Sequence, residues 1–280
     1  MKKIAFLALM LAAVVYGNAT DIWTGTKHVS WNDGGVQIAA TQFANAVAGN
    51  KIVVHYTGAT DGIEFKVMNA NFDHVAGSRE AAWISGDGTF ELFLTVAAVD
   101  SLKAHGLEVI GANFNTTQIE LLDGKELKEG LTIWTGFFWA DDWTTLELYR
   151  DAYSYVDFSN VQAIRFYSEA GRTDYVINVK SSWEDAGHIA DKSMMTDGTD
   201  YAELTLTDTL RQKFAASSHL MVQFNKEAGA AFNVTDIVLI MTPTAIVNSR
   251  EEVKAVKVIE NGQIVIYKNG IRYNALGVEF

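Results

Sequence analysis

The chain of 280 residues contains no cysteine and a single proline, Pro243. Without cysteine it forms no disulfide bond, offers no thiolate to a metal ion and has no cysteine nucleophile. The absence also excludes a lipoprotein signal, which depends on a cysteine. The stability of the fold must therefore come from packing alone. Pro243 stands where we place the end of the second folded module.

Positive charge is scarce, and long apolar runs are absent from the body of the chain. The 22 lysine and arginine residues face 34 aspartate and glutamate residues, which leaves a net charge of −12. Such a chain repels phosphate backbones and anionic lipid surfaces, so we expect no nucleic-acid partner. No apolar run reaches about 20 residues, the length of a transmembrane helix, so we also expect no membrane insertion.

Catalytic and metal-binding signatures are missing as well. The six histidines show neither HxH nor HExxH spacing, and no G-x-S-x-G sequence occurs. A glycosidase needs two carboxylates across a bond, and acids are too numerous here to nominate a pair. We therefore predict a protein that is not an enzyme and that needs no cofactor. A structural Ca²⁺ ion in the aspartate-rich turns stays open, although no EF-hand loop is present.

The first 19 residues predict an export signal. Lys2 and Lys3 precede an apolar run from Ile4 to Tyr16, and Gly17-Asn18-Ala19 supplies small residues for cleavage after Ala19. We expect the mature chain to be secreted or held at the cell surface. Removing the signal leaves 20 basic and 34 acidic residues, a net charge of −14.

A repeat with an offset of 111 positions (134 − 23) organises the rest of the chain. Ile22-Trp23-Thr24-Gly25 returns as Ile133-Trp134-Thr135-Gly136, and the run Phe114–Leu121 returns, after a further slip, as Phe232–Leu239. A period of this length indicates a duplicated domain, because about 110 residues can bury their own core. We predict a signal peptide at 1–19, module 1 at 20–122, a linker at 123–130, module 2 at 131–243, and a connector and tail at 244–280.

Short strand-like segments and polar turns dominate both modules. Lys51–Thr57, Ile63–Met68 and Thr89–Val96 carry β-branched and aromatic residues, several of them in alternation. About nine such strands in about 100 residues predict an all-β fold. We expect two tandem β-sandwich domains of jelly-roll, galactose-binding-like form.

Three segments have helical character, and the tail has strand character. The helical segments are Thr41–Val47, Ala97–Ala104 and Asp208–Ala216, the second of which ends before Gly106. In the tail, two β runs joined through Asn261-Gly262 predict a β-hairpin.

Aromatic residues make up 11% of the chain and supply the candidate binding site. A sugar stacks its C–H face on a flat ring, and its hydroxyls bond to polar side chains at the ring edge. Several aromatic residues stand beside polar turns, and Phe138, Trp139 and Trp143 form a cluster interleaved with acids. The predicted carbohydrate-binding residues are Trp31, Phe72, Trp83, Trp139, Trp143, Trp183, Asp33 and Asp142. In contrast, Trp23 and Trp134 each follow isoleucine at a strand start, which favours a place in the core.

Both modules resemble the jelly-roll modules appended to secreted polysaccharide-degrading enzymes of Bacteroides-type bacteria. Module 1 matches that pattern through Ile22-Trp23-Thr24-Gly25, Trp31, Phe43–Asn50, Leu102–Gly111 and Thr117–Leu121, with Asn50 where the pattern has aspartate. Module 2 diverges further, since Ser217-Ser218-His219-Leu220 replaces the Gly-Leu pair. The resemblance implies carbohydrate binding. The tail resembles the C-terminal segments of type IX secretion, which implies contact with secretion or surface machinery.

These observations predict a secreted, non-catalytic protein with two tandem modules that bind a polysaccharide or oligosaccharide, of plant or β-linked glucan type. One alternative is a structural or surface-assembly protein that uses its sandwiches for protein contacts. Another is a distant glycoside hydrolase. Aromatic faces beside acids favour sugar, because a protein interface more often presents a continuous apolar patch.

Overall fold

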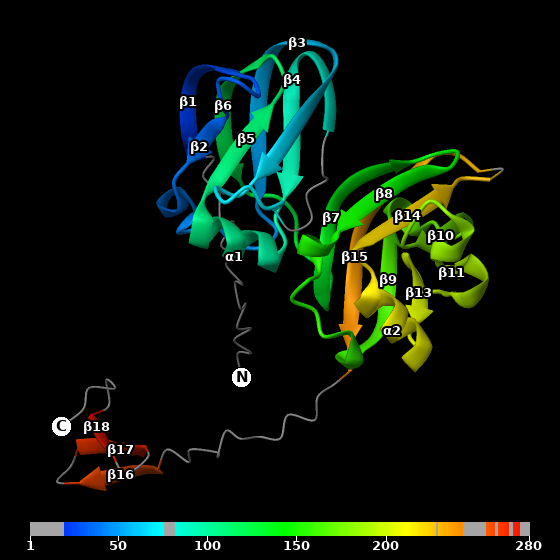
Figure 1. Ribbon diagram of the computed structural model, residues 1–280. Coiled ribbons are helices and arrows are strands. Elements are labelled where there is room, and N and C mark those ends of the chain that lie inside the picture. The colour runs from blue at the N-terminus through cyan, green and yellow to red at the C-terminus, as the bar shows by residue number, and fades with distance from the viewer. Residues whose placement is uncertain are drawn as a thin grey trace, which may run out of the picture. The chain divides into compact units, whose positions relative to one another are not determined.

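The computed structural model describes residues 20–75, 82–227 and 229–242, together with three strands between residues 256 and 274. The predicted signal peptide, residues 1–19, lies outside the described residues. The fold is all-β, as the sequence predicts, with antiparallel sheets and two α-helices (Figure 1). The described residues up to Met241 form one compact unit, and those of the tail form a second. None of the described helices is long and apolar enough to cross a membrane.

Residues 20–122 form one folded sheet of six strands. The strand order is β1-β6-β3-β5-β2, and β4 pairs with β3. The strands are β1 (Thr20–Val29), β2 (Val36–Ile38), β3 (Lys51–Met68), β4 (Ala82–Phe93), β5 (Leu107–Gly111) and β6 (Phe114–Leu122).

Strand β3 pairs with three other strands of this sheet, β4, β5 and β6. Its first half pairs with β6 and its second half with β5, so that one long strand contributes to both ends of the sheet. The sequence predicts two separate strands here, Lys51–Thr57 and Ile63–Met68. They are one strand, because β4 pairs with both halves across an irregular stretch. Gly58 and Gly62 adopt the positive φ angles that this bend requires.

The helix α1 (Val96–His105) follows β4, close to its predicted bounds. The hydroxyl of Thr95 accepts a hydrogen bond from the Ala98 N–H and caps its N-terminus, and Gly106, with φ 82°, follows its end. The helical prediction for Thr41–Val47 is wrong in extent. Only a 3-10 helix, η1 (Ala40–Phe43), forms there, and its N-cap Ala39 has no side chain that can accept a hydrogen bond.

Residues 131–241 form two facing sheets. One has the order β11-β10-β14-β8 and the other β12-β13-β9-β15-β7 (Figure 1). The strands are β7 (Leu131–Ala140), β8 (Thr144–Tyr149), β9 (Val161–Ser168), β10 (Val176–Lys180), β11 (His188–Asp191), β12 (Thr196–Asp197), β13 (Tyr201–Thr205), β14 (His219–Asn225) and β15 (Phe232–Met241). The helix α2 (Asp208–Ala216) has the predicted bounds. Short 3-10 helices occupy the loops: η2 (Arg150–Ala152), η3 (Phe158–Asn160), η4 (Glu169–Gly171), η5 (Asp185–Gly187) and η6 (Lys192–Met194).

Each region has a hydrophobic core of its own. In the second, Ile177 and Val179 of β10 belong to the same buried cluster as Ile164 and Phe166 of β9, and along β10 the neighbours of Ile177 and Val179 are more exposed. This period of two is the pattern of a strand with one buried face. A separate buried cluster lies among the strands of residues 20–122.

The repeated Ile-Trp-Thr-Gly sequence has a structural cause. Trp134 is buried, and its indole lies over Gly136, where an added Cβ would lie 3.0 Å from Cζ2 of the ring. Trp23 packs against the other core in the same way, over Gly25. The prediction that both tryptophans belong to the core is confirmed for Trp134, while Trp23 is half-buried.

The tail contains the predicted hairpin and one more strand. Strand β16 (Val256–Glu260) pairs with β17 (Gln263–Lys268), and β18 (Ile271–Asn274) extends the sheet from β17. The result is a three-stranded antiparallel meander.

Candidate functional site

All six predicted aromatic residues are exposed. Between 52% and 72% of the surface of each is open to solvent, with Trp31 the least and Trp83 the most exposed. Exposing a large ring forgoes the free energy of burying it, about 1.5–3 kcal/mol for a large apolar side chain. Because these rings lie outside both cores, they are free to contact a ligand.

Trp31 and Asp33 share a tight turn after β1. The N–H of Gly34 donates to the carbonyl of Ser30 at 2.9 Å, which closes the turn. The Ser30 hydroxyl donates to Asp33 Oδ2 at 2.7 Å and accepts from the Asp33 N–H at 3.0 Å. The ammonium of Lys66 lies 5.9 Å from the centre of the Trp31 ring. A rigid turn thus presents one ring and one carboxylate side by side.

Phe72 stands on a strained turn between β3 and β4. Its φ is 65°, a conformation that few bulky residues adopt. The buried Asn69 holds the turn, because its Oδ1 accepts hydrogen bonds from the N–H groups of Asn71 and Asp73. The turn keeps the Phe72 ring outside the core at a cost in backbone strain.

Trp143 is held in the same conformation, with φ 55°, at the tip of the β7–β8 hairpin. The ammonium of Lys226 pairs with Asp141 and lies 3.6 Å from Oδ2 of the predicted site residue Asp142. This contact lowers the pKa of the Asp141 carboxyl. The Asp141 N–H also donates to Thr144 Oγ1 at 3.1 Å. The hairpin tip is therefore braced on both sides of the tryptophan.

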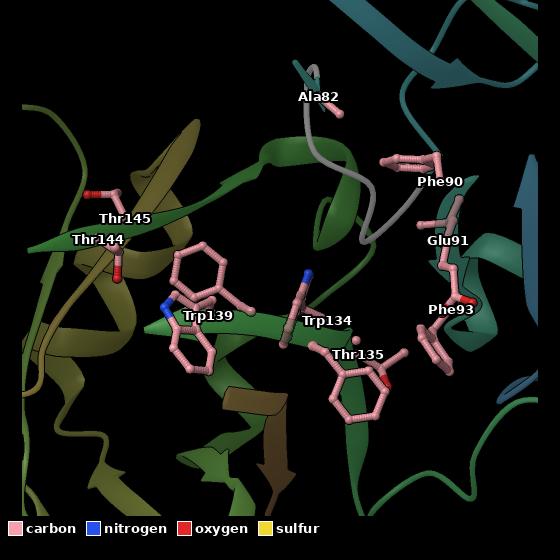
Figure 2. Close-up of a pocket in the computed structure, with 13 residues that line it drawn as sticks. Ala82, Phe90, Glu91, Phe93, Trp134, Thr135, Trp139, Thr144 and Thr145 are labelled. Carbon is pink, nitrogen blue, oxygen red and sulfur yellow. The ribbon is translucent and has the colours of Figure 1, made fainter. Parts of the chain in front are cut away.

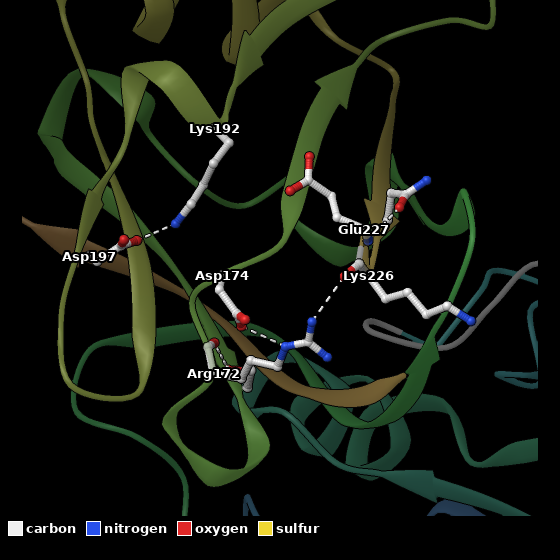
Figure 3. Close-up of polar contacts among 8 residues, drawn as sticks. Arg172, Asp174, Lys192, Asp197, Lys226 and Glu227 are labelled. Carbon is white, nitrogen blue, oxygen red and sulfur yellow. Dashed lines mark hydrogen bonds and ion pairs between the residues drawn. The ribbon is translucent and has the colours of Figure 1, made fainter. Parts of the chain in front are cut away.

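A second layer of contacts fixes the loop that carries Lys226. The guanidinium of Arg172 donates to the Lys226 carbonyl at 3.0 Å and to Asp174 at 2.6 Å (Figure 3). The same guanidinium lies 4.9 Å from the centre of the Phe232 ring. Arg172 thus ties the Lys226 loop to the body of the sandwich, which preorganises the turn that presents Trp143.

Trp183 and Trp83 occupy other places. Trp183 lies in the loop between β10 and β11, where the Ser181 N–H donates to the Gly187 carbonyl at 2.8 Å. Trp83 lies on β4, opposite Glu64 of β3.

A groove of about 620 Å³ lies between β4 and the β7–β8 hairpin (Figure 2). Its aromatic lining comes from both strands: Phe90 and Phe93 on β4, and Trp134, Phe137, Phe138 and Trp139 on β7. Thr144 and Thr145 of β8 and Glu91 of β4 supply polar groups. The Glu91 carboxylate pairs with Lys51 Nζ at 2.7 Å, which orients it. The groove therefore combines flat apolar faces with hydroxyl and carboxylate groups.

Trp139 is the one predicted site residue among those that line the groove. Trp83 follows the lining residue Ala82, whereas the turns of Trp31, Phe72, Trp143 and Trp183 lie elsewhere. The candidate site is thus one groove together with separate aromatic turns. That these residues contact a ligand stays a prediction.

The sequence interpretation misplaces one phenylalanine and misses others. Phe138, grouped with Trp139 and Trp143 at first, is buried in the core, and Phe137 shares the exposed face with Trp139. Spacing by two from Trp139 along a strand would have indicated Phe137. Phe90 and Phe93 carried no comparable signal, because only the tertiary structure brings β4 to β7.

Among the described residues, no group of three or more histidine, aspartate or glutamate side chains is placed to hold a metal ion. The structural Ca²⁺ that the sequence leaves open stays an untested alternative.

Comparisons with known proteins find only distant similarity. No protein-family model matches the chain, and no curated protein matches it. One similar solved structure is the Bacteroides ovatus mixed-linkage glucan utilization locus protein SGBP-B in complex with a mixed-linkage heptasaccharide. It is 17% identical, with a TM-score of 0.34, over 37% of this chain and 30% of that chain. Another is a Parabacteroides distasonis protein inferred to be secreted, 9% identical with a TM-score of 0.19, over 80% of this chain and 86% of that chain. The matched part thus spans less than a third of the length of the first structure.

Proposed function

We propose that this protein binds polysaccharide without cleaving it, through the groove between β4 and β7 and through the exposed aromatic turns. The single observation that carries the proposal is the lining of that groove. Phe137 and Trp139 project from one strand beside the hydroxyls of Thr144 and Thr145, with the Glu91 carboxylate opposite. A sugar ring needs this combination of an apolar face and polar groups at its edge.

The preorganisation of the turns supports the same function. A chain that only needed solubility would place polar residues at its turns, not rings held at φ 65° and 55°. Backbone strain of this kind persists where the presented side chain has a use. Phe72 and Trp143 therefore extend the proposed binding surface beyond the groove.

The distribution of carboxylates argues for binding rather than hydrolysis. Glycosidases place two carboxyl groups about 5–10 Å apart across the scissile bond. Among the described residues that line the groove, Glu91 is the one carboxylate, and Lys51 pairs with it. We expect no release of reducing ends from xylan, mannan, mixed-linkage glucan or cellulose derivatives. Release by pure protein that one carboxylate substitution abolishes would establish an enzyme instead.

We also propose that the chain is a tandem duplication with the module bounds predicted from the sequence. In residues 20–122 the order β1-β6-β3 joins the opening strand, the closing strand and the strand at Lys51. In residues 131–241 the order β7-β15-β9 joins their counterparts. Equal strand order at the offset of the sequence repeat supports the duplication. Export through residues 1–19, to the outside or the surface of the cell, and recognition of the tail by secretion or surface machinery belong to the same proposal.

Native affinity electrophoresis against a panel of soluble polysaccharides tests the function. The protein should be retarded by at least one polysaccharide, and Trp139→Ala should reduce that retardation. Val47→Ala is the matched control, because Val47 is an equally exposed apolar residue that does not line the groove. Equal retardation of the wild type and Trp139→Ala would remove the groove from the site. Retardation by no polysaccharide at all would count against carbohydrate binding.

A further inference from the structure

Lys125, in the charged linker between the sheet of residues 20–122 and the sandwich of residues 131–241, is anchored by its backbone to the first of them. Its N–H donates to the Gly49 carbonyl at 2.9 Å. The two chain segments approach so closely that an added Cβ on Gly49 would lie 2.3 Å from the Lys125 carbonyl oxygen. An added Cβ on Gly124 would lie 2.0 Å from the Gly49 oxygen. Only glycine permits this contact at both positions.

The side chain of the same residue reaches into the second sandwich. Lys125 Nζ lies 2.7 Å from the Thr235 carbonyl, 3.1 Å from Asp236 Oδ2 and 3.3 Å from the Gly136 carbonyl. A bulge exposes these carbonyls, because two residues of β7 oppose Thr235 alone on β15. The Asp236 side chain is 2% exposed, so the ammonium is the partner of a buried carboxylate.

Two rings of the groove enclose this ammonium. Lys125 Nζ lies 5.8 Å from the centre of the Phe93 ring and 5.4 Å from that of Phe137. The two rings meet edge to face, with their centres 5.5 Å apart. Burial lowers the pKa of the Lys125 ammonium, and Asp236 opposes that shift. Cation–π contacts gain strength when the cation is desolvated in this way.

Phe93 and Phe137 both line the groove, one from each wall. We propose that Lys125 is a positioning residue that sets the separation of the two walls of the binding groove, by clamping Phe93 and Phe137 through one ammonium. This inference rests on the proposed polysaccharide binding. The linker would then be part of the site's specificity, since the wall separation decides how many sugar faces the groove accepts at once.

The test uses two variants of the full mature chain. Lys125→Met alone leaves Asp236 as a lone buried charge, so the main variant is Lys125→Met/Asp236→Asn, which removes both charges together. Lys128→Met is the matched control, because Lys128 lies in the same linker and binds to the second sandwich through Asp200 at 2.8 Å and the Tyr167 ring. Circular dichroism melts confirm that each variant folds.

Two measurements distinguish the positioning of the groove walls by Lys125 from the binding of polysaccharide. The chain has no cysteine, so spin labels on Lys103→Cys and Met194→Cys, one exposed site in each sandwich, report the distribution of distances between them. Affinity electrophoresis reports binding of the polysaccharide that retards the wild type most. We expect the double variant to broaden the distance distribution and to lose at least tenfold in affinity, while Lys128→Met changes neither.

Three outcomes would overturn the proposal, each in a recognisable way. An unchanged distance distribution in the double variant would show that Lys125 clamps nothing. A broadened distribution with unchanged affinity would leave polysaccharide binding intact and remove the positioning role. Absence of binding by the wild type would remove the proposed function and the positioning role together.

Discussion

The indole of Trp134 covers the α-carbon of Gly136, so closely that an added Cβ would lie 3.0 Å from Cζ2 of the ring. Trp134 and Gly136 are two residues apart on the strand and therefore lie on the same face of the sheet. The Trp134 ring occupies the space that a side chain at position 136 would fill. Trp23 and Gly25 repeat the arrangement at 3.2 Å. The spacing of tryptophan and glycine in the repeated sequence is therefore a packing requirement of the opening strand.

Gly136→Ala should destabilise the protein by about 1–3 kcal/mol, the usual cost of overpacking a core. Gly136 is the cleaner test of the pair, because Gly25 also has a φ of 154° that would strain any other residue. Chemical denaturation of the wild type and the variant measures the difference. Combining Gly136→Ala with Trp134→Leu should cost less than the sum of the two single changes. If the two changes in unfolding free energy simply add in the double variant, the Trp134 ring and the methyl group of the new alanine do not compete for the same space.

Trp134 and Trp139 both line the groove, but only Trp134 is buried, so their substitutions should differ in their effect on stability. Trp134→Ala should lower the free energy of unfolding by about 3–5 kcal/mol, as expected for a buried tryptophan. Trp139→Ala should change stability by no more than about 0.5 kcal/mol, because the ring is exposed. Its affinity for the polysaccharide should fall by a factor of about 5 to 150, which corresponds to about 1–3 kcal/mol for one stacking platform. Collapse of the Trp139→Ala variant would place the ring in the core and contradict the proposed site.

Trp143→Gly should weaken binding without weakening the fold. Glycine adopts φ 55° without strain, whereas the left-handed conformation costs other residues about 1–2 kcal/mol. We expect the melting temperature to stay level or rise while affinity falls. Trp183→Gly is the control for stability, since Trp183 is also exposed but has no positive φ, and glycine there should lower the melting temperature. A lower melting temperature for Trp143→Gly would show that its turn carries no strain.

Acid should destabilise the second sandwich. Four of its carboxyls have lowered pKa values. Lys226 lowers the pKa of Asp141 and Arg172 that of Asp174, each through a hydrogen bond to the carboxylate. Ser159 lowers the pKa of Asp157 and Ser193 that of Asp191 in the same way. A carboxyl whose folded pKa lies below its unfolded value stabilises the fold fully above about pH 4. That contribution disappears as the pH falls through the folded pKa.

Thermal melts between pH 7 and pH 2 measure this dependence. The melting temperature should stay nearly level down to about pH 5 and fall below about pH 4. Asp174→Asn, which loses the pair with Arg172, should flatten the decline, and Glu129→Gln, an exposed linker residue, should leave it unchanged. A melting temperature that rises towards pH 2 would contradict the sign of all four shifts.

Local features of this protein could be predicted well from the sequence. The helix α2 begins after Thr207, whose hydroxyl accepts from the Leu210 N–H, so its start follows from a local capping signal. The alternation of Ile177 and Val179 with polar neighbours predicts one buried face. The exposed tryptophans beside polar turns were recognisable for the same reason, because a turn offers no core to enter.

The sequence does not predict which of two adjacent apolar residues on a strand is exposed. Phe137 and Phe138 are equally apolar, so alternation cannot decide which of them faces solvent. The bulge opposite Thr235 decides it, by setting the register of β7 against β15. The prediction grouped Phe138 with Trp139, and only the pairing of the strands shows that Phe137 is the neighbour on the same face.

The amino-acid sequence by itself determined the all-β class, the core role of Trp134 and six of the exposed rings, because each follows from residues a few positions apart. The tertiary structure alone decided that β4 faces β7 across a groove and that Lys125 lies between Phe93 and Phe137. A charged residue in a linker looks solvated from the sequence. It becomes a clamp only because Asp236, 111 positions further along the chain, is buried where the ammonium can reach it.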